Sequence, residues 1–71
     1  MFTTQYVTPA NMGQQVILVK ANGGTVVVEK QVGTDWVTTD TISADGGYRM
    51  DLGRTPTRFT PANGAAYEVG A

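Results

Sequence analysis

Residues 14–32 read QQVILVKANGGTVVVEKQV and hold the densest β-branched runs of the chain. Two apolar runs flank an Asn-Gly-Gly sequence at residues 22–24, and an Asn-Gly pair supplies the positive-φ residues that a tight hairpin turn requires. We therefore expect a β-hairpin whose arms are residues 14–21 and 25–32.

The two arms differ in the faces that they offer to a core. Residues 16–19 (VILV) are apolar on both faces, which is typical of a strand covered on two sides, within the domain or by a second subunit. In the returning arm, Val26, Val28 and Val32 share one face, which we expect to point into the core. Val27 lies on the opposite face, where it is a candidate subunit contact.

Further β-prone segments follow, separated by Gly, Pro, Asn and Asp. None has a helical apolar period over ten residues or more, so we expect no α-helix. Six or seven short strands with frequent turn signals indicate one all-β domain over residues 1–71, an antiparallel β-sandwich or a small barrel. Besides the hairpin, the expected strands are residues 2–8, at an edge, and 36–43, 48–52, 57–60 and 65–69. Residues 48–52 alternate, so we expect Tyr48, Met50 and Leu52 to point inward and Arg49 and Asp51 outward.

The size of the chain limits how stable it is alone. A domain of 71 residues buries only about 60% of the surface that its unfolded chain exposes. The chain has no Cys and no His, which argues against disulfides and against zinc, haem and iron-sulfur centres. We therefore expect no cofactor, and we expect that a partner surface, most simply copies of the same chain, completes the core.

Charge and hydropathy exclude two further classes of partner. The net charge is −1, only 15% of residues are charged, and no basic stripe is visible, so we expect no nucleic-acid binding. No apolar run approaches the roughly 20 residues that span a bilayer, and the first residues lack a signal-peptide pattern. We expect a soluble chain that binds no membrane.

The chain has few of the residue types that are typical of catalysis. Ser43 is the single serine, and without His or Cys no nucleophile has its usual base, so we expect no enzyme activity. Asp35, Asp40, Asp45 and Asp51 recur along the chain, but their spacing does not match the alternate positions of a calcium loop. We interpret Asp35 and Asp45 as turn formers and Asp40 and Asp51 as solvated strand positions, and we expect no metal site.

Three aromatic residues admit two interpretations. Trp36, Tyr48 and Tyr67 could form a stacking platform for sugar rings, as in carbohydrate-binding β-sandwiches. Each also lies on the expected inward face of its strand, with Trp36 on the same face as Ile42, and we favour the core. A carbohydrate-binding module that uses Trp36 and Tyr48 is the alternative function.

Exposed strand edges and arginines suggest contacts between subunits. The first strand contains Phe2 and Tyr6 and is a candidate sticky edge. Arginines in the last third could pair with Glu29, Asp40 or Glu68 of another subunit, although ordinary surface ion pairs are an equal alternative. The candidate subunit-contact residues are Phe2, Tyr6, Val27, Arg49, Arg54 and Arg58.

The order of turns resembles that of a known class of protein. Residues 26–52, VVVEKQVGTDWVTTDTISADGGYRMDL, resemble small β-sandwich virion proteins and domains of tailed bacteriophages. In these a strand leads to a Gly-Thr-x-Trp turn, then a strand, then an x-Asp-Gly-x-Tyr hairpin. Residues 58–69, RFTPANGAAYEV, are similar to the end of those domains, and the resemblance extends over residues 23–69 in rhythm and turn chemistry.

The resemblance implies a non-enzymatic structural protein of a phage or virus particle. Such a protein decorates or cements a capsid, joins head to tail, or forms part of the tail. It implies self-association, for example as a trimer, docking on a larger capsid or tail protein, and location in the virion after assembly in the host cytoplasm. It transfers no site residues, because the contacts of this class are surfaces.

Overall fold

The computed structural model describes residues 1–70 and confirms the all-β prediction. It contains no α-helix within that range, and none of its elements is a helix that could cross a membrane. The strands are β1 (Tyr6–Val7), β2 (Gln14–Lys20), β3 (Thr25–Val32), β4 (Asp35–Ile42), β5 (Gly46–Asp51), β6 (Thr57–Ala62) and β7 (Ala66–Val69).

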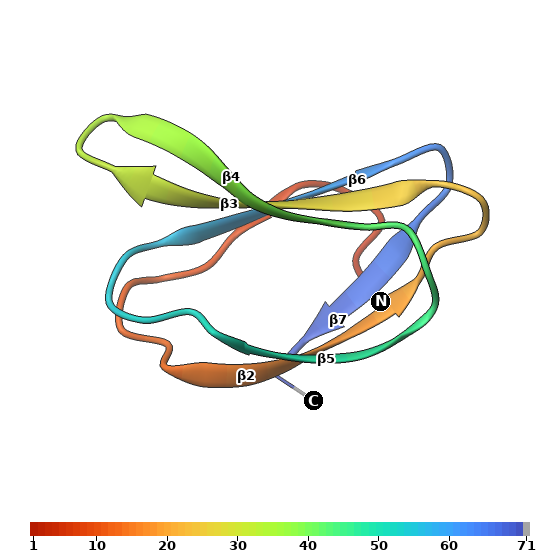
Figure 1. The fold of residues 1–71 in the computed structure, drawn as a ribbon, viewed down its shortest axis with the longest axis horizontal. Coiled ribbons are helices and arrows are strands. Elements are labelled where there is room, and N and C mark those ends of the chain that lie inside the picture. The colour runs from red at the N-terminus through yellow and green to blue at the C-terminus, as the bar shows by residue number, and fades with distance from the viewer. Residues whose placement is uncertain (71) are drawn as a thin grey trace.

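The strands form two antiparallel sheets. The four-stranded sheet has the order β1-β6-β3-β4 and the three-stranded sheet the order β5-β2-β7. Figure 1 shows the sheets as two layers, and the buried residues of both layers form one apolar core. Of the two architectures that the sequence left open, the molecule is therefore the sandwich.

The predicted hairpin of residues 14–32 is wrong, because β2 and β3 belong to different sheets. The turn itself has the predicted conformation: Asn22 and Gly23 have φ of 52° and 81°, and Gly24 N donates to Ala21 O at 2.7 Å. However, it carries the chain from one layer to the other. Paired arms would leave both apolar faces on one side of a single sheet, whereas stacked arms bury them against each other.

Two later turns also cross between the layers at the same end of the molecule (Figure 1). They are the β4–β5 turn, expected from its Asp-Gly pair to close a hairpin, and the β6–β7 turn. Hydrogen bonds join them to the first turn: Ala21 N donates to Asp45 Oδ1 at 2.7 Å, and Asn22 Nδ2 donates to Gly64 O at 3.0 Å. Asp45 is thus a turn residue, as predicted, and it also ties two turns together.

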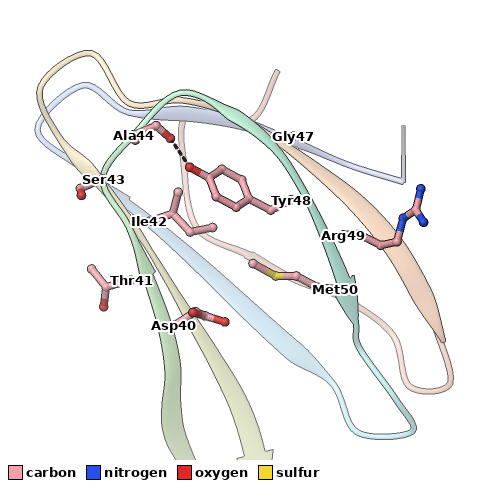
Figure 2. Close-up of a pocket in the computed structure, with 9 residues that line it drawn as sticks. All are labelled: Asp40, Thr41, Ile42, Ser43, Ala44, Gly47, Tyr48, Arg49 and Met50. Carbon is pink, nitrogen blue, oxygen red and sulfur yellow. Dashed lines mark hydrogen bonds between the residues drawn. The ribbon is translucent and has the colours of Figure 1, made fainter.

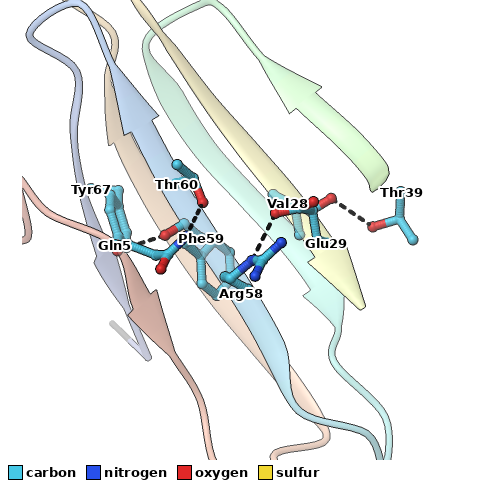
Figure 3. A network of polar contacts seen from close by, with 8 residues as sticks. All are labelled: Gln5, Val28, Glu29, Thr39, Arg58, Phe59, Thr60 and Tyr67. Carbon is cyan, nitrogen blue, oxygen red and sulfur yellow. Dashed lines mark hydrogen bonds and ion pairs between the residues drawn. The ribbon is translucent and has the colours of Figure 1, made fainter. Parts of the chain in front are cut away.

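Within residues 1–70, β3 and β4 are the only consecutive strands that pair with each other, and a β-bulge interrupts their ladder. Val28 pairs with Asp40 and Glu29 with Thr38, so Thr39 is the extra residue on β4. Its Oγ1 donates to Val28 O at 3.3 Å (Figure 3). The bulge adds one residue to β4 and so interrupts the alternation of its side chains. Residues on either side of Thr39 that strict alternation would place on one face therefore point to opposite faces.

On the β3–β4 hairpin, two residues that the sequence placed on the inward face, Trp36 and Val32, are not part of the core. Ile42 is buried in the core, but the bulge turns Trp36 to the outer face of the four-stranded sheet. Val32 is 61% exposed, because the end of the β3–β4 hairpin extends beyond the three-stranded sheet (Figure 1). Val26 and Val28, at 0% and 1% exposure, confirm the predicted inward face of β3.

The two largest fully buried side chains of the core are aromatic. Phe59 and Tyr67 are fully buried, and their ring centroids lie 5.5 Å apart. The Tyr67 hydroxyl lies within hydrogen-bond distance of Thr4 O (2.7 Å) and Phe59 O (3.3 Å). The other buried members of the core are Ile17, Val19, Ala21, Val26, Val28, Ile42, Leu52 and Ala65.

Neighbouring positions on β3 test the inward face. Val28→Asp places an unpaired charge in the core and is expected to lower the free energy of unfolding by about 3 kcal/mol or more, enough to unfold a domain of this size. Val27→Asp, on the half-buried outer face, is expected to leave the chain folded, with a change within about 1 kcal/mol. Circular dichroism and urea unfolding measure both. Equal effects would contradict this assignment.

Adjacent glycines test the turn between β2 and β3. A Cβ at Gly24 would overlap the carbonyl oxygen of Ala62, whereas a Cβ at Gly23 meets nothing within 4 Å. Gly24→Ala is therefore expected to destabilise the fold by about 3 kcal/mol or more. Gly23→Ala is expected to cost only the roughly 1–2 kcal/mol of a positive φ. Thermal and urea unfolding of the two variants compare them, and a milder effect at Gly24 would be the contradictory result.

Candidate functional site

The N-terminal segment closes one side of the sandwich. Phe2 N donates to Tyr67 O at 2.7 Å and Tyr67 N donates to Phe2 O at 3.0 Å, so this segment bridges to β7. A few residues later β1 pairs with β6, where Tyr6 is the partner of Phe59. The predicted strand over residues 2–8 is therefore shorter than expected, a two-residue edge strand preceded by an isolated bridge to the other sheet.

Two of the candidate contact residues contact each other at this closed side. The rings of Phe2 and Tyr6 are stacked, with centroids 4.6 Å apart and an interplanar angle of 8°. The Phe2 ring also lies 5.4 Å from the Tyr67 ring. Phe2 remains 38% exposed, and both of these ring contacts are within the chain.

The opposite side of the sandwich is open. There β4 and β5 are the edge strands of different sheets and do not pair. Between them lies a hollow of about 510 Å³ (Figure 2). Ile42, Tyr48 and Met50 supply its apolar lining, while Asp40 and Ser43 lie at the β4 end of the same hollow. This open side, from β4 to β5, is the candidate functional site.

Side chains of β5 alternate across this edge. Figure 2 shows Tyr48 and Met50 on the side of the hollow and Arg49 pointing away from it. The Tyr48 hydroxyl donates to Ala44 O at 2.7 Å, which holds the ring across the β4–β5 turn. Tyr48 and Met50 pack against the core, as the sequence pattern predicted.

The open side holds no arrangement typical of catalysis. Among the described residues that line the hollow, Asp40 is the only carboxylate, and none of them is a base beside Ser43. No group of three or more His, Cys, Asp or Glu side chains that could hold a metal ion occurs among the residues that the structure describes. What the site offers is a hollow between two strand edges, with apolar side chains from Ile42, Tyr48 and Met50 beside polar ones from β4.

Trp36, Tyr48 and Tyr67 do not form one platform. Tyr67 is fully buried, which confirms its predicted place in the core. The prediction for Trp36 was wrong, because the bulge on β4 places it on the outer face of the sheet, where the guanidinium carbon of Arg58 lies 4.5 Å from the ring centroid. Trp36 and Tyr48 thus lie on different sheets and different faces, so they cannot stack together on a sugar ring.

Arg58 is engaged within the chain. Its Nε donates to Glu29 Oε1 at 2.9 Å across the β6–β3 pair (Figure 3), and its guanidinium covers Trp36 on β4. These three side chains therefore cross-link three strands on the outer face of the four-stranded sheet. The candidate partner that the sequence suggested for another subunit, Glu29, is here the partner of Arg58 in the same chain.

The remaining candidates differ in their surroundings. Val27 is half-buried on the outer face of β3. Arg49 and Arg54 are exposed, and neither forms an ion pair with another residue in the range 1–70. Sequence reasoning missed Asp51, which follows Arg49 by two residues on the same face of an edge strand. The alternation of residues 48–52 indicated that Arg49 and Asp51 share a face. It did not indicate that their strand lies at the edge of a sheet.

Burial affects one titratable group in the core. Desolvation of the Tyr67 phenol, reinforced by the neighbouring Tyr6, raises the pKa of Tyr67 from 10.0 to about 12. The folded chain thus holds this proton more tightly than the unfolded chain. The stabilising contribution of the neutral phenol is complete below pH 10, and it is lost as the pH rises toward 12.

Tyr67→Phe tests this effect. At pH 7 the variant is expected to lose about 1–2 kcal/mol of stability with the hydroxyl's hydrogen bonds. Between about pH 10 and pH 12 the wild-type chain is expected to lose more stability than the variant, so the difference between them narrows. Urea unfolding at pH 7, 9 and 11.5 measures it. A difference independent of pH would show that Tyr67 does not titrate in this way.

Comparison of the chain with models of known protein families, with curated proteins and with solved structures found no match. Function is therefore inferred from the residues and their geometry.

Proposed function

We propose that this chain is a non-enzymatic structural protein of a phage or virus particle. It self-associates and docks on a capsid or tail protein as a decoration, cement or joining component, and it is located in the virion. The observation that carries the proposal is the open side of the sandwich, where β4 and β5 are unpaired edges on either side of a hollow with a mixed polar and apolar lining. The resemblance of residues 26–52 to small virion β-sandwiches supplies the kind of particle.

The energetics of a small domain support an assembled state. A chain of 71 residues without disulfides has little stability to spare, so covering partly exposed apolar side chains yields a large relative gain. Unpaired strand edges add backbone donors and acceptors that readily bind another strand. Both features lie on the same side of this molecule, where Ile42, Tyr48 and Met50 line the hollow.

A second surface supports docking on a different protein. The end of the β3–β4 hairpin projects beyond the three-stranded sheet (Figure 1), and Val32 and Val37 on it are 61% and 49% exposed. Exposed apolar side chains on a projecting hairpin are suited to a pocket or groove of a larger partner. Self-association through the open side leaves this hairpin available.

Particle association is tested with a tagged chain expressed in its natural host during particle production. The tagged chain is expected to sediment with particles on a density gradient and to be visible on them by immunogold electron microscopy. Val37→Asp adds a charge to the exposed hairpin and is expected to leave the fold intact but reduce the particle-bound fraction about tenfold. The matched control is Val7→Asp, the same change at a valine of similar exposure (46%) on β1, at the closed side of the sandwich. A tagged chain that stays at the top of the gradient would contradict the proposal.

A further inference from the structure

We infer that two copies of this chain associate edge to edge through β5, antiparallel about a two-fold axis, so that Arg49 of each copy lies opposite Asp51 of the other. The inference rests on the proposed self-association and specifies its contact. The occupant of the β5 edge is thus a second copy of the chain. The direction of the backbone groups and the order of charges along the strand support this assignment.

Four strands lie at sheet edges, and three of them are poor candidates. On one side of the sandwich the bridge of Phe2 to Tyr67 links the N-terminal segment to β7, close to β1. On the other side β4 carries a bulge at Thr39, and its charged residues, Asp35 and Asp40, are both acidic, so a second β4 adds only negative charge. Bulges and like charges protect an edge from pairing. The remaining edge, β5, pairs with β2 in an unbroken register.

Hydrogen bonds show which backbone groups of β5 are available. Leu52 N donates to Gly13 O at 2.7 Å, so the backbone of Leu52 faces β2. In an antiparallel pair, alternate residues direct their N–H and C=O groups toward the same neighbour. Met50 and Tyr48 therefore face β2 as well, and the residues between them face the open edge.

The other edge of β2 gives the same result. Gly70 N donates to Val16 O at 3.1 Å, so Val16 faces β7 and its neighbour Ile17 faces β5. Ile17 is the ladder partner of Tyr48, which again places the backbone of Tyr48 toward β2. The residues that present free N–H and C=O groups at the edge are thus Gly47, Arg49 and Asp51.

Charge then selects the register. Opposite residues of an antiparallel pair share a face, and like charges directly opposite destabilise the pair. A two-fold axis at Arg49 places Arg49 opposite itself, and an axis at Asp51 places Asp51 opposite itself. An axis at Tyr48 places Asp51 opposite Asp45. Only an axis at Met50 places Arg49 opposite Asp51, and it does so twice.

The same register matches the apolar face. It places Met50 opposite Met50 of the second copy and Tyr48 opposite Leu52, so inward side chains meet inward side chains. Met50 and Tyr48 line the hollow, and the second copy therefore extends the apolar cover over the open side. Asp51 Oδ1 accepts from Gly53 N at 2.9 Å, which leaves its other oxygen for the guanidinium. The result is one continuous sheet of six strands across two copies.

Two charge reversals test the register. In Arg49→Asp both cross-strand pairs become acidic, and in Asp51→Arg both become basic, so each variant alone is expected to dimerise at least about tenfold more weakly than the wild type. In a mixture of the two variants every cross-strand pair again joins opposite charges, so a mixed dimer is expected to form. The matched control is Arg54→Asp, which makes the same change of charge at an exposed residue outside β5.

One strand pair is a small contact, so the dimer is expected to be weak. Sedimentation velocity from about 10 µM to about 1 mM measures dimerisation, and native mass spectrometry detects the mixed dimer. Amide exchange of the wild-type chain gives an independent readout that needs no variant to fold. Exchange at Arg49 and Asp51 should slow with rising concentration, whereas exchange at Tyr48 and Met50 should not.

A wild-type chain that stays monomeric throughout this range would overturn the inference, and so would Arg49→Asp dimerising as well as the wild type. If either result accompanies a chain that still sediments with particles, this contact is wrong, whereas the proposed docking on a particle is unaffected. If the dimer forms with this charge dependence but the chain never associates with particles, the proposed function is wrong and the β5 contact remains supported.

Discussion

Three turns that pass between the layers determine the rest of this structure. They lie at one end of the sandwich and are joined by hydrogen bonds from Ala21 to Asp45 and from Asn22 to Gly64. The backbone at Gly24 approaches Ala62 so closely that no side chain fits there. Because the first turn crosses the layers, Ile17 and Val19 of one sheet face Val26 and Val28 of the other, and this contact creates the core.

The resulting sandwich is asymmetric. The N-terminal segment pairs with β7 through Phe2 and Tyr67 and closes one side, with the Phe2–Tyr6 stack covering it. Within residues 1–70 no strand performs that role between β4 and β5, so the hollow and the free backbone groups of β5 remain open. The proposed assembly follows from this difference, since a second chain at β5 supplies the missing strand.

The sequence predicted much of the candidate site but not its location. Tyr48 and Met50 were assigned inward from simple alternation, and Arg49 was selected for its charge. Asp51 was considered only as a solvated residue, because its importance depends on β5 being an edge strand. β5 is an edge strand because β2 lies in the middle of the three-stranded sheet, with β5 on one side and β7 on the other. No local pattern in residues 46–51 contains this information.

By itself the sequence determined the strand content, the positions of the turns and the inward faces of Val26, Val28 and Tyr67. These depend on short-range chemistry: β-branched runs, positive-φ turn residues and alternation of side chains along a strand. Only the tertiary structure decided which strands pair and that the Asn-Gly turn joins two layers. It also decided that a bulge at Thr39 places Trp36 on the outer face, opposite to the face of Ile42. Pairing partners are remote in sequence, and one extra residue in β4 shifts the alternation of side chains from one side of the bulge to the other. The pairing partners and the position of the bulge are therefore selected by the packing of the whole chain.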